Sequence, residues 1–223
     1  MVIPLEVAVY LAIIGDLIDS RHMSAKERSR VQQVLKQTLA KINQTYAVDI
    51  AANFLITLGD EFQGLLKRSD NVFIIMEQIQ ADLPTHPVRF GLGIGAIYTP
   101  LEKDAIGADG PAFHLARQAL DNIKHFARKS EQPKSLMRLE SETIASDLIN
   151  HMFAQIYYQS SHWTEKQQQI VWLMRTASSQ KELAEQLNVS QPYINQVLQA
   201  TGYYTYRASL QAIVKEIKRQ RYG

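Results

Sequence analysis

Cysteine is absent from this chain of 223 residues, which excludes disulfides, thiolate metal sites and cysteine nucleophiles. Long apolar runs are absent too: the longest near the start, "VAVYLAIIG", is too short to span a bilayer. Glu6, rather than a basic segment, precedes that run, so we expect no export signal. These absences together predict a soluble protein of a reducing, cytoplasmic compartment with no membrane partner.

Several sequence signatures of enzymes are also missing. The chain has no Walker loop, no dinucleotide-binding fingerprint and no Ser-His-Asp arrangement. Its six histidines are scattered without the spacing of metal ligands, and we interpret them as structural. With 46% hydrophobic and 21% charged residues, the chain is expected to bury an ordinary packed core.

The net charge of +2 is small, but it is unevenly distributed. Residues 160–223 carry eight Lys/Arg against four Asp/Glu, whereas residues 1–159 carry sixteen against eighteen. A basic C-terminal part suggests a polyanionic partner, and a solvated helix end explains the same excess equally well.

Apolar patterning predicts strands and helices in the order β-α-β-β-α-β-α-β-α. This order favours a mixed α/β (α+β) layer fold with a ferredoxin-like core. The expected strands are 7–14, 53–57, 61–67, 88–99 and 135–139. The expected helices are 24–43, 70–83 and 141–157, and residues 107–127 are expected to form a loop that runs into a further helix. From about residue 160 the strand signal ends, so we predict two domains, 1–159 and an all-α domain over 160–223.

The stretch "SQKELAEQLNVSQPYINQVLQATGY" resembles a helix-turn-helix. Asn188 falls where the turn needs a left-handed residue, and Ser190 can cap the second helix. In a DNA-binding protein the exposed side of that helix would read bases or contact phosphates. The predicted DNA contacts are Ser190, Gln191, Tyr193, Asn195, Gln196 and Gln199.

This helix has no Lys or Arg, so phosphate contacts are expected from the basic tail, at Lys215, Lys218, Arg219 and Arg221. A helical packing or dimerisation module remains the alternative.

Two carboxylates end apolar runs in the first half of the chain. Asp16 follows the first strand, and Asp60 lies in the Gly59-Asp60 turn of the predicted hairpin. If the hairpin lies beside the first strand, Asp16 and Asp60 meet, and their oxygens suit Mg²⁺ or Mn²⁺ with phosphate oxygens. Asp19 and Glu61 are nearby candidates. Ordinary turn chemistry remains the alternative for Asp60.

These segments resemble class III nucleotide cyclases over about residues 7–150. "AIIGDLIDSR" is similar to their first metal-binding strand end and "LITLGDEFQGLL" to their hairpin, in which "LGDEF" matches four letters of the GGDEF signature. The resemblance implies a metal at Asp16 and Asp60 and a homodimer. It further implies a nucleoside triphosphate near Gly59, Asp109, Gly110 and Arg117, although "GADGP" also reads as a simple turn.

A closer similarity is to the SatD family, for which "IIGDLIDSR", "TLGDEFQGL" and "GADGPAFHLAR" with a helix-turn-helix tail are characteristic. The cyclase resemblance has gaps. Phe113 stands where cyclases carry an Asn four residues before Arg117, and Ile56 and Thr57 lie where a purine-reading Lys is expected.

Three functions therefore remain open: a DNA-binding regulator with a metal- and nucleotide-sensing domain, an active nucleotidyl-transfer enzyme, and a protein-interaction module with vestigial sites.

Overall fold

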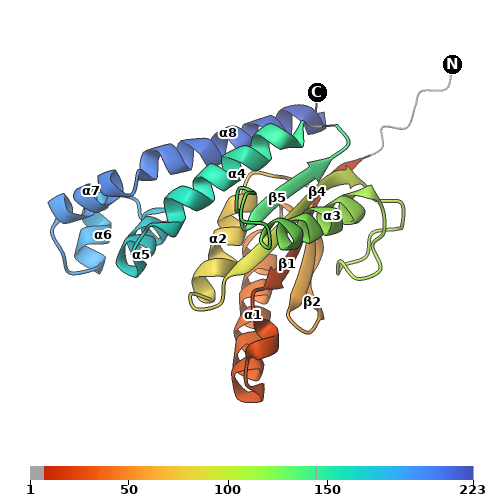
Figure 1. Cartoon of the computed structure of the whole chain (residues 1–223), viewed down its shortest axis with the longest axis horizontal. Helices are drawn as coiled ribbons and strands as arrows, with labels where there is room; N and C mark the ends of the chain where they lie inside the picture. Colours follow the sequence, from red (N-terminus) through yellow and green to blue (C-terminus); the bar gives the residue numbers. More distant parts are fainter. Residues whose placement is uncertain (1–7, 144, 223) are drawn as a thin grey trace.

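The computed structural model describes residues 8–143 and 145–222, and Val7, at the start of the first predicted strand, lies outside them. A five-stranded sheet has the order β2-β3-β1-β4-β5, in which only β4 and β5 run parallel (Figure 1). Eight α-helices accompany it among the described residues. The strands are β1 Val9–Leu17, β2 Ile50–Leu58, β3 Glu61–Leu66, β4 Val88–Ala96 and β5 Met137–Ser141.

The helices follow the predicted alternation through the sheet and then continue alone. They are α1 Ala25–Thr45, α2 Val72–Asp82, α3 Pro111–Phe126, α4 Ser146–Ser161, α5 Glu165–Met174, α6 Gln180–Gln186, α7 Gln191–Ala200 and α8 Tyr203–Tyr222. The mixed α/β fold, the hairpin and the pairing of β1 with β3 are thereby confirmed. Several boundaries differ. β1 continues through Asp16 to Leu17, because β4 pairs with it over its whole length. β2 begins at Ile50 rather than 53, β4 ends at Ala96 rather than 99, and α4 begins at Ser146 rather than 141.

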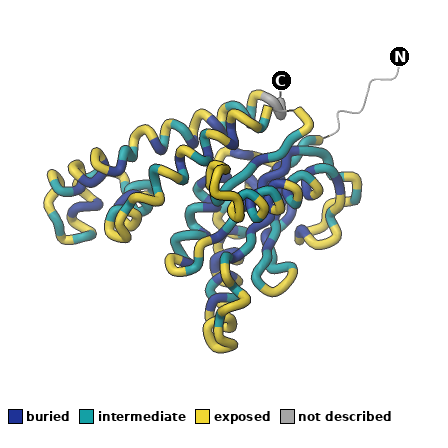
Figure 2. The backbone as a smooth tube through the Cα atoms, in the orientation of Figure 1, coloured by how far each residue is buried: buried dark blue, intermediate teal, exposed yellow. Residues whose placement is uncertain are grey.

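The sheet has two differently covered faces. On one face the largest apolar core joins the sheet to α1, α2, α4 and α8. On the other face α3 packs on β4, β5 and β1, and the apolar cluster there includes Ala12, Ile14 and Leu65 of the strands and Ala105 of the loop before α3. Figure 2 shows the buried residues concentrated around the sheet and the inner sides of these helices.

Glycines on β4 bring α3 unusually close to the sheet. A side-chain carbon at Gly91 would lie 2.2 Å from the carbonyl oxygen of Ala116, and one at Gly93 would lie 2.1 Å from that of Ala112. The alternation in "GLGIG" thus places small residues toward α3 and Leu92 and Ile94 toward the other face. As a result, long side chains on α3 reach the strand ends beneath them.

The short helices α5, α6 and α7 form a small apolar cluster of their own. The predicted turn is confirmed in detail: Asn188 is left-handed with φ 52°, and the Ser190 hydroxyl accepts a hydrogen bond from the Tyr193 N–H at 3.3 Å. Helix α8, in contrast, runs back along α4 and buries Leu210, Ile213 and Ile217 in the core of the sheet (Figure 1). A separate helix-turn-helix domain beginning at residue 160 therefore stays a prediction.

Glu77 on α2 links the sheet region to the later helices. Its carboxylate accepts hydrogen bonds from Arg175 at 2.8 Å and from the Tyr206 hydroxyl at 2.6 Å, and it lies 3.5 Å from Arg207. The Arg175 side chain is only 2% exposed and also donates to the carbonyl of Ile74. This single carboxylate therefore anchors α5 and α8 to α2.

Burial, together with the charge of Glu77, raises the pKa of the Tyr206 phenol well above its usual value near 10. The folded state holds this proton more tightly than the unfolded chain, so its contribution to stability is complete below pH ~10 and is lost as the pH rises toward the folded pKa. We expect the free energy of unfolding in urea to fall above pH ~10, and to fall less in Tyr206→Phe. Tyr98→Phe, at a 75% exposed position, is the control, and equal declines in both variants would contradict this cause.

Candidate metal and nucleotide site at the strand ends

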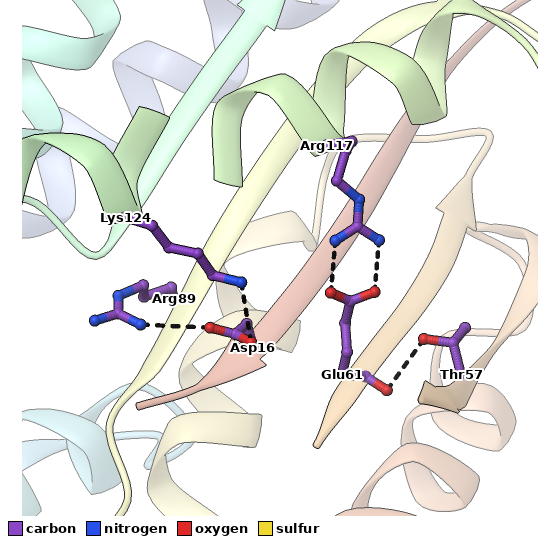
Figure 3. Close-up of polar contacts among 6 residues, drawn as sticks. All are labelled: Asp16, Thr57, Glu61, Arg89, Arg117 and Lys124. Atoms are coloured by element: carbon purple, nitrogen blue, oxygen red, sulfur yellow. Dashed lines mark hydrogen bonds and ion pairs between the residues drawn. The ribbon is translucent and has the colours of Figure 1, made fainter. Parts of the chain in front are cut away.

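A group of charged side chains lies where β1 ends and β3 begins. Asp16 is directly opposite Glu61 on β3 and opposite Arg89 on β4. All three continue the strand positions that face α3, because they alternate with residues of the opposite core. Together with Arg117 and Lys124 of α3 they form what we call the strand-end cluster (Figure 3).

Asp16 is held by two cations from different elements. Its carboxylate lies 3.4 Å from Arg89 Nη1 and 3.2 Å from Lys124 Nζ, and the side chain is 13% exposed. A carboxylate so little exposed requires such partners, because burial of an unpaired charge is costly. The charge of Asp16 is therefore already compensated in the described state.

Glu61 makes a two-pronged ion pair with α3. Arg117 Nη1 and Nη2 each donate to one carboxylate oxygen of Glu61 at 2.5 Å, and Figure 3 shows the two groups facing each other. The hydrogen bond to Glu61 raises the pKa of Arg117 above its usual value. The backbone carbonyl of Glu61 accepts a further hydrogen bond from Thr57 Oγ1 at 3.2 Å. This fork fixes α3 over the start of β3.

The hairpin tip carries the second predicted metal ligand. Gly59 is left-handed with φ 62°, and its carbonyl accepts a hydrogen bond from Gln32 at 2.6 Å. Asp60, half-buried, directly precedes Glu61 and so lies one residue from the register partner of Asp16. Its side chain makes no hydrogen bond or ion pair with any residue that the structure describes, in contrast to Asp16 and Glu61. Asp60 is thus a carboxylate of the hairpin turn that is left available to a ligand.

Sequence reasoning named Arg117 but missed the other two cations of this cluster. Arg117, Asp121 and Lys124 follow one another at helical spacing, four and then three residues apart, which places them on one face of α3. Arg89 occupies the second position of β4, opposite Asp16. The helical spacing was readable in the sequence, whereas the contact with β1 depended on the order of the strands.

The predicted residues Asp109 and Gly110 lie at the opposite end of α3. Gly110 precedes the first turn of the helix, and Lys124 follows fourteen residues later, about 21 Å along the axis. The Asp109 carboxylate lies 2.9 Å from His114, and the Asp109 N–H donates to Thr99 Oγ1. Local contacts therefore hold this loop, and it does not join the strand-end cluster.

The predicted DNA contacts on α7 divide into two groups. Ser190 uses its hydroxyl as the helix cap, and Tyr193 is partly buried against the α5–α7 cluster with Lys166 5.2 Å above its ring. The remaining four are exposed on α7: Gln191, Asn195, Gln196 and Gln199.

The structure corrects the expectation that the basic tail supplies phosphate contacts for α7. Helix α8 is straight and carries Lys218 and Arg219 to the end of the molecule away from α7 (Figure 1). There Lys218 pairs with Asp70 and Arg219 with Glu216, and the side chain of Arg221 lies outside the described part of the chain.

A comparison with known protein families identifies the family of this chain. The model of the SatD family matches residues 10–215, nearly the full chain. The chain belongs to the SatD family. A comparison with curated protein sequences gave no match for this SatD protein.

Solved structures similar to this SatD protein are nucleotide cyclase domains. The dimeric guanylyl cyclase domain of the RhoGC fusion protein of the fungus Blastocladiella emersonii is 12% identical, with a TM-score of 0.41 over 51% of this chain and 74% of that chain. The guanylate cyclase domain of RhGC from Catenaria anguillulae, in complex with GTP, is 14% identical, with a TM-score of 0.42 over 51% and 72%. A bacterial light-regulated adenylyl cyclase is 11% identical, with a TM-score of 0.44 over 60% and 76%.

The donor set of the SatD protein fits a hard divalent cation only in part. Carboxylate oxygens of Asp16 and Asp60 are the ligands that Mg²⁺ and Mn²⁺ prefer, and magnesium commonly keeps one or two carboxylates with water and phosphate oxygens. Within residues 8–143 and 145–222 no three His, Asp or Glu side chains form a preassembled metal site. The described carboxylates alone therefore do not complete a metal site.

Among the described residues, every helix is too short or too polar to span a membrane.

Proposed function

We propose that this SatD protein binds a nucleoside polyphosphate together with Mg²⁺ or Mn²⁺ at the strand-end cluster, and that it acts as a sensor. The observation that carries this proposal is the grouping of Asp16 and Glu61 with three cations on one face of the sheet, together with the unpartnered Asp60 in the hairpin turn that directly precedes Glu61. Carboxylates suit the metal, and Arg117 and Lys124 suit phosphate oxygens.

Binding would exchange partners rather than bury new charge. In the described state, Lys124 and Arg89 neutralise Asp16, and Arg117 neutralises Glu61. A divalent cation held by Asp16 and Asp60 would take over the role of Lys124 beside Asp16, and Lys124 would then be free to contact the phosphates, while Arg89 would stay beside Asp16. Every charge keeps a counter-charge through this exchange, which avoids the cost of an unpaired charge in a partly buried place.

Two positions at which the cyclase resemblance requires polar nucleotide contacts, an Asn and a Lys, are changed in this chain, and this favours a sensing role over turnover. Phe113, which stands where the resemblance requires an Asn, is buried at 7% exposure against Ala12 and Ile14. Thr57 uses its hydroxyl for Glu61, and Ile56 packs on the main core. None of these side chains can stabilise developing charge on a transferred phosphoryl group. An active cyclising enzyme is therefore the alternative that we rank second.

A thermal-unfolding screen with ATP, GTP, CTP and UTP, each with Mg²⁺, Mn²⁺ or chelator, tests the proposal. Ligand at about one hundred times its dissociation constant adds about 2.7 kcal/mol of stability, or about 5–10 °C for a chain of this length. We expect a shift for at least one nucleotide only with metal, and no release of pyrophosphate. Release of pyrophosphate would establish the enzyme alternative, and no shift with any combination would contradict nucleotide binding.

A DNA-binding output is the second part of the proposal, and the exposed amides of α7 favour it. Gln191, Asn195, Gln196 and Gln199 project from a helix with a well-formed turn and cap before it. The segment that holds α5–α7 has three basic residues, Lys166, Arg175 and Lys181, and three acidic ones, Glu165, Glu182 and Glu185. Arg175 is already paired with Glu77 and is not available to DNA.

With so few local cations, we expect any DNA affinity to depend weakly on salt, and we expect a homodimer to supply two half-sites. Selection from a random duplex pool, with Gln196→Ala for comparison, tests the DNA output, and light scattering tests the dimer. Failure to enrich any sequence would leave a protein-interaction role for α5–α7.

A further inference from the structure

A pocket of about 320 Å³ adjoins the strand-end cluster beyond the end of β1. It lies between the C-terminal end of α3, the start of β5 and α4. Its apolar lining includes Ile18, Ile123, Phe126, Leu136, Met137 and Ala154. This volume falls at the lower end of the range for pockets that hold small molecules.

The charged residues of this pocket are all of one sign. Arg89, Lys134 and Arg138 line it, and none of the described residues that line it is Asp or Glu. Arg89 and Arg138 each pair with a carboxylate outside the pocket, so their remaining N–H donors face the pocket, where they attract an anion and provide no partner for a cation. The pocket is therefore suited to a ligand with one anionic end and one apolar body.

Two of the cations, Arg138 and Arg89, have guanidinium N–H groups that make no hydrogen bond with the described residues. Arg138 uses Nε for Glu140 at 2.7 Å, and its guanidinium lies 5.1 Å from the centre of the Phe126 ring. Its two Nη groups make no hydrogen bond with the described residues. Arg89 uses only Nη1, for Asp16 at 3.4 Å. Both side chains are about one-fifth exposed, so an anion placed between them would be largely removed from water.

We propose that this pocket binds a small organic anion, a phosphate or carboxylate on a flat apolar body, distinct from the metal-bound nucleotide. The anionic group lies against Arg89 and Arg138, and the flat body lies against Phe126 and Met137. Arg89 joins the pocket to the strand-end cluster, because the same guanidinium holds Asp16. An anion that draws Arg89 away leaves Asp16 freer to accept a metal, so the two ligands favour each other. This last step, unlike the pocket itself, rests on the proposed function.

Calorimetric titration of the full chain without metal or nucleotide tests the pocket alone. The probes are phenyl phosphate, benzoate, inorganic phosphate and the neutral benzyl alcohol. We expect the aromatic anions to bind, inorganic phosphate to bind more weakly and benzyl alcohol not to bind at millimolar concentration. If neither aromatic anion binds, or if benzyl alcohol binds as well as they do, the proposal is overturned.

Two variants locate the binding. Arg138→Met removes a pocket charge while keeping an apolar chain, and Ala154→Phe fills the pocket from α4. We expect each to weaken phenyl phosphate at least tenfold, and Ala154→Phe to spare inorganic phosphate. Arg30→Met, at an exposed position on α1, is the matched control. Thermal unfolding verifies that each variant is folded, and unchanged affinity in both folded pocket variants would overturn the assignment.

The coupling has its own readout. We expect Mn²⁺ with nucleotide to bind more tightly when phenyl phosphate saturates the pocket, and Arg89→Met to remove this effect. If metal and nucleotide do not bind at all while phenyl phosphate does, the proposed function fails and the pocket stands. If both bind without influencing each other, the link through Arg89 is wrong.

Discussion

Replacing Asp60 by asparagine abolishes the metal-dependent stabilisation by nucleotide and leaves the fold intact. The Asp60 side chain has no partner among the described residues, so the amide costs the free protein little. The same change removes a negatively charged oxygen ligand from a site that has only two carboxylates for the metal. We therefore expect the whole nucleotide-induced rise of about 5–10 °C to disappear in Asp60→Asn.

Asp147→Asn is the matched control for this measurement, because Asp147 is exposed on α4, away from the cluster. Asp16→Asn should also lose the nucleotide effect, but it lowers the basal melting temperature as well, since Arg89 and Lys124 lose their partner. A full nucleotide shift in folded Asp60→Asn would reduce the Gly59-Asp60 turn to hairpin chemistry and remove Asp60 from the site.

Replacing Glu77 by alanine destabilises the protein strongly, because two buried partners depend on this carboxylate. Arg175, with only 2% of its side chain exposed, would keep its charge without a carboxylate, and the buried Tyr206 hydroxyl would lose its acceptor. Breaking a buried ion pair from one side costs about 3–5 kcal/mol. We expect a loss of about 3 kcal/mol in urea unfolding, because Glu77 itself is 20% exposed.

Glu77→Gln, which keeps an acceptor of the same shape, should lose less than the alanine variant. Glu131→Ala, at an exposed loop position, is the control and should change stability by less than about 0.5 kcal/mol. If Glu77→Ala behaves like this control, the carboxylate does not anchor α5 and α8, and their attachment rests on apolar packing alone.

Local signals in the sequence were sufficient for the hairpin and for the α6–α7 turn. A two-residue Gly59-Asp60 connection between apolar runs determines the hairpin, and Asn188 with Ser190 determines the turn and cap. Each depends on residues a few positions apart, so neither requires knowledge of the rest of the fold. The existence of the five strands and their alternation with helices along the chain followed from the same kind of pattern.

Contacts between distant segments could not be predicted in this way. The pair of Glu77 and Arg175 joins positions 98 residues apart, and Lys218 meets Asp70 across 148. The basic tail was expected to supply phosphate contacts for the helix-turn-helix, but α8 continues as one helix of 20 residues and carries the tail away from α7 (Figure 1). Likewise, Asp16 could be predicted at a strand end, while Arg89 and Lys124 became its partners only through the strand order and the close approach of α3.

The central claim is that a divalent metal bound with a nucleotide rests on Asp16 and Asp60. The most direct test is the anomalous scattering of Mn²⁺ in crystals grown with the nucleotide that stabilises the protein most. The account predicts a peak in direct contact with carboxylate oxygens of both residues, with Lys124 or Arg117 turned from its carboxylate toward the phosphates. A peak elsewhere, or a nucleotide bound with the Asp16 and Glu61 ion pairs unchanged and no manganese beside Asp60, would contradict it.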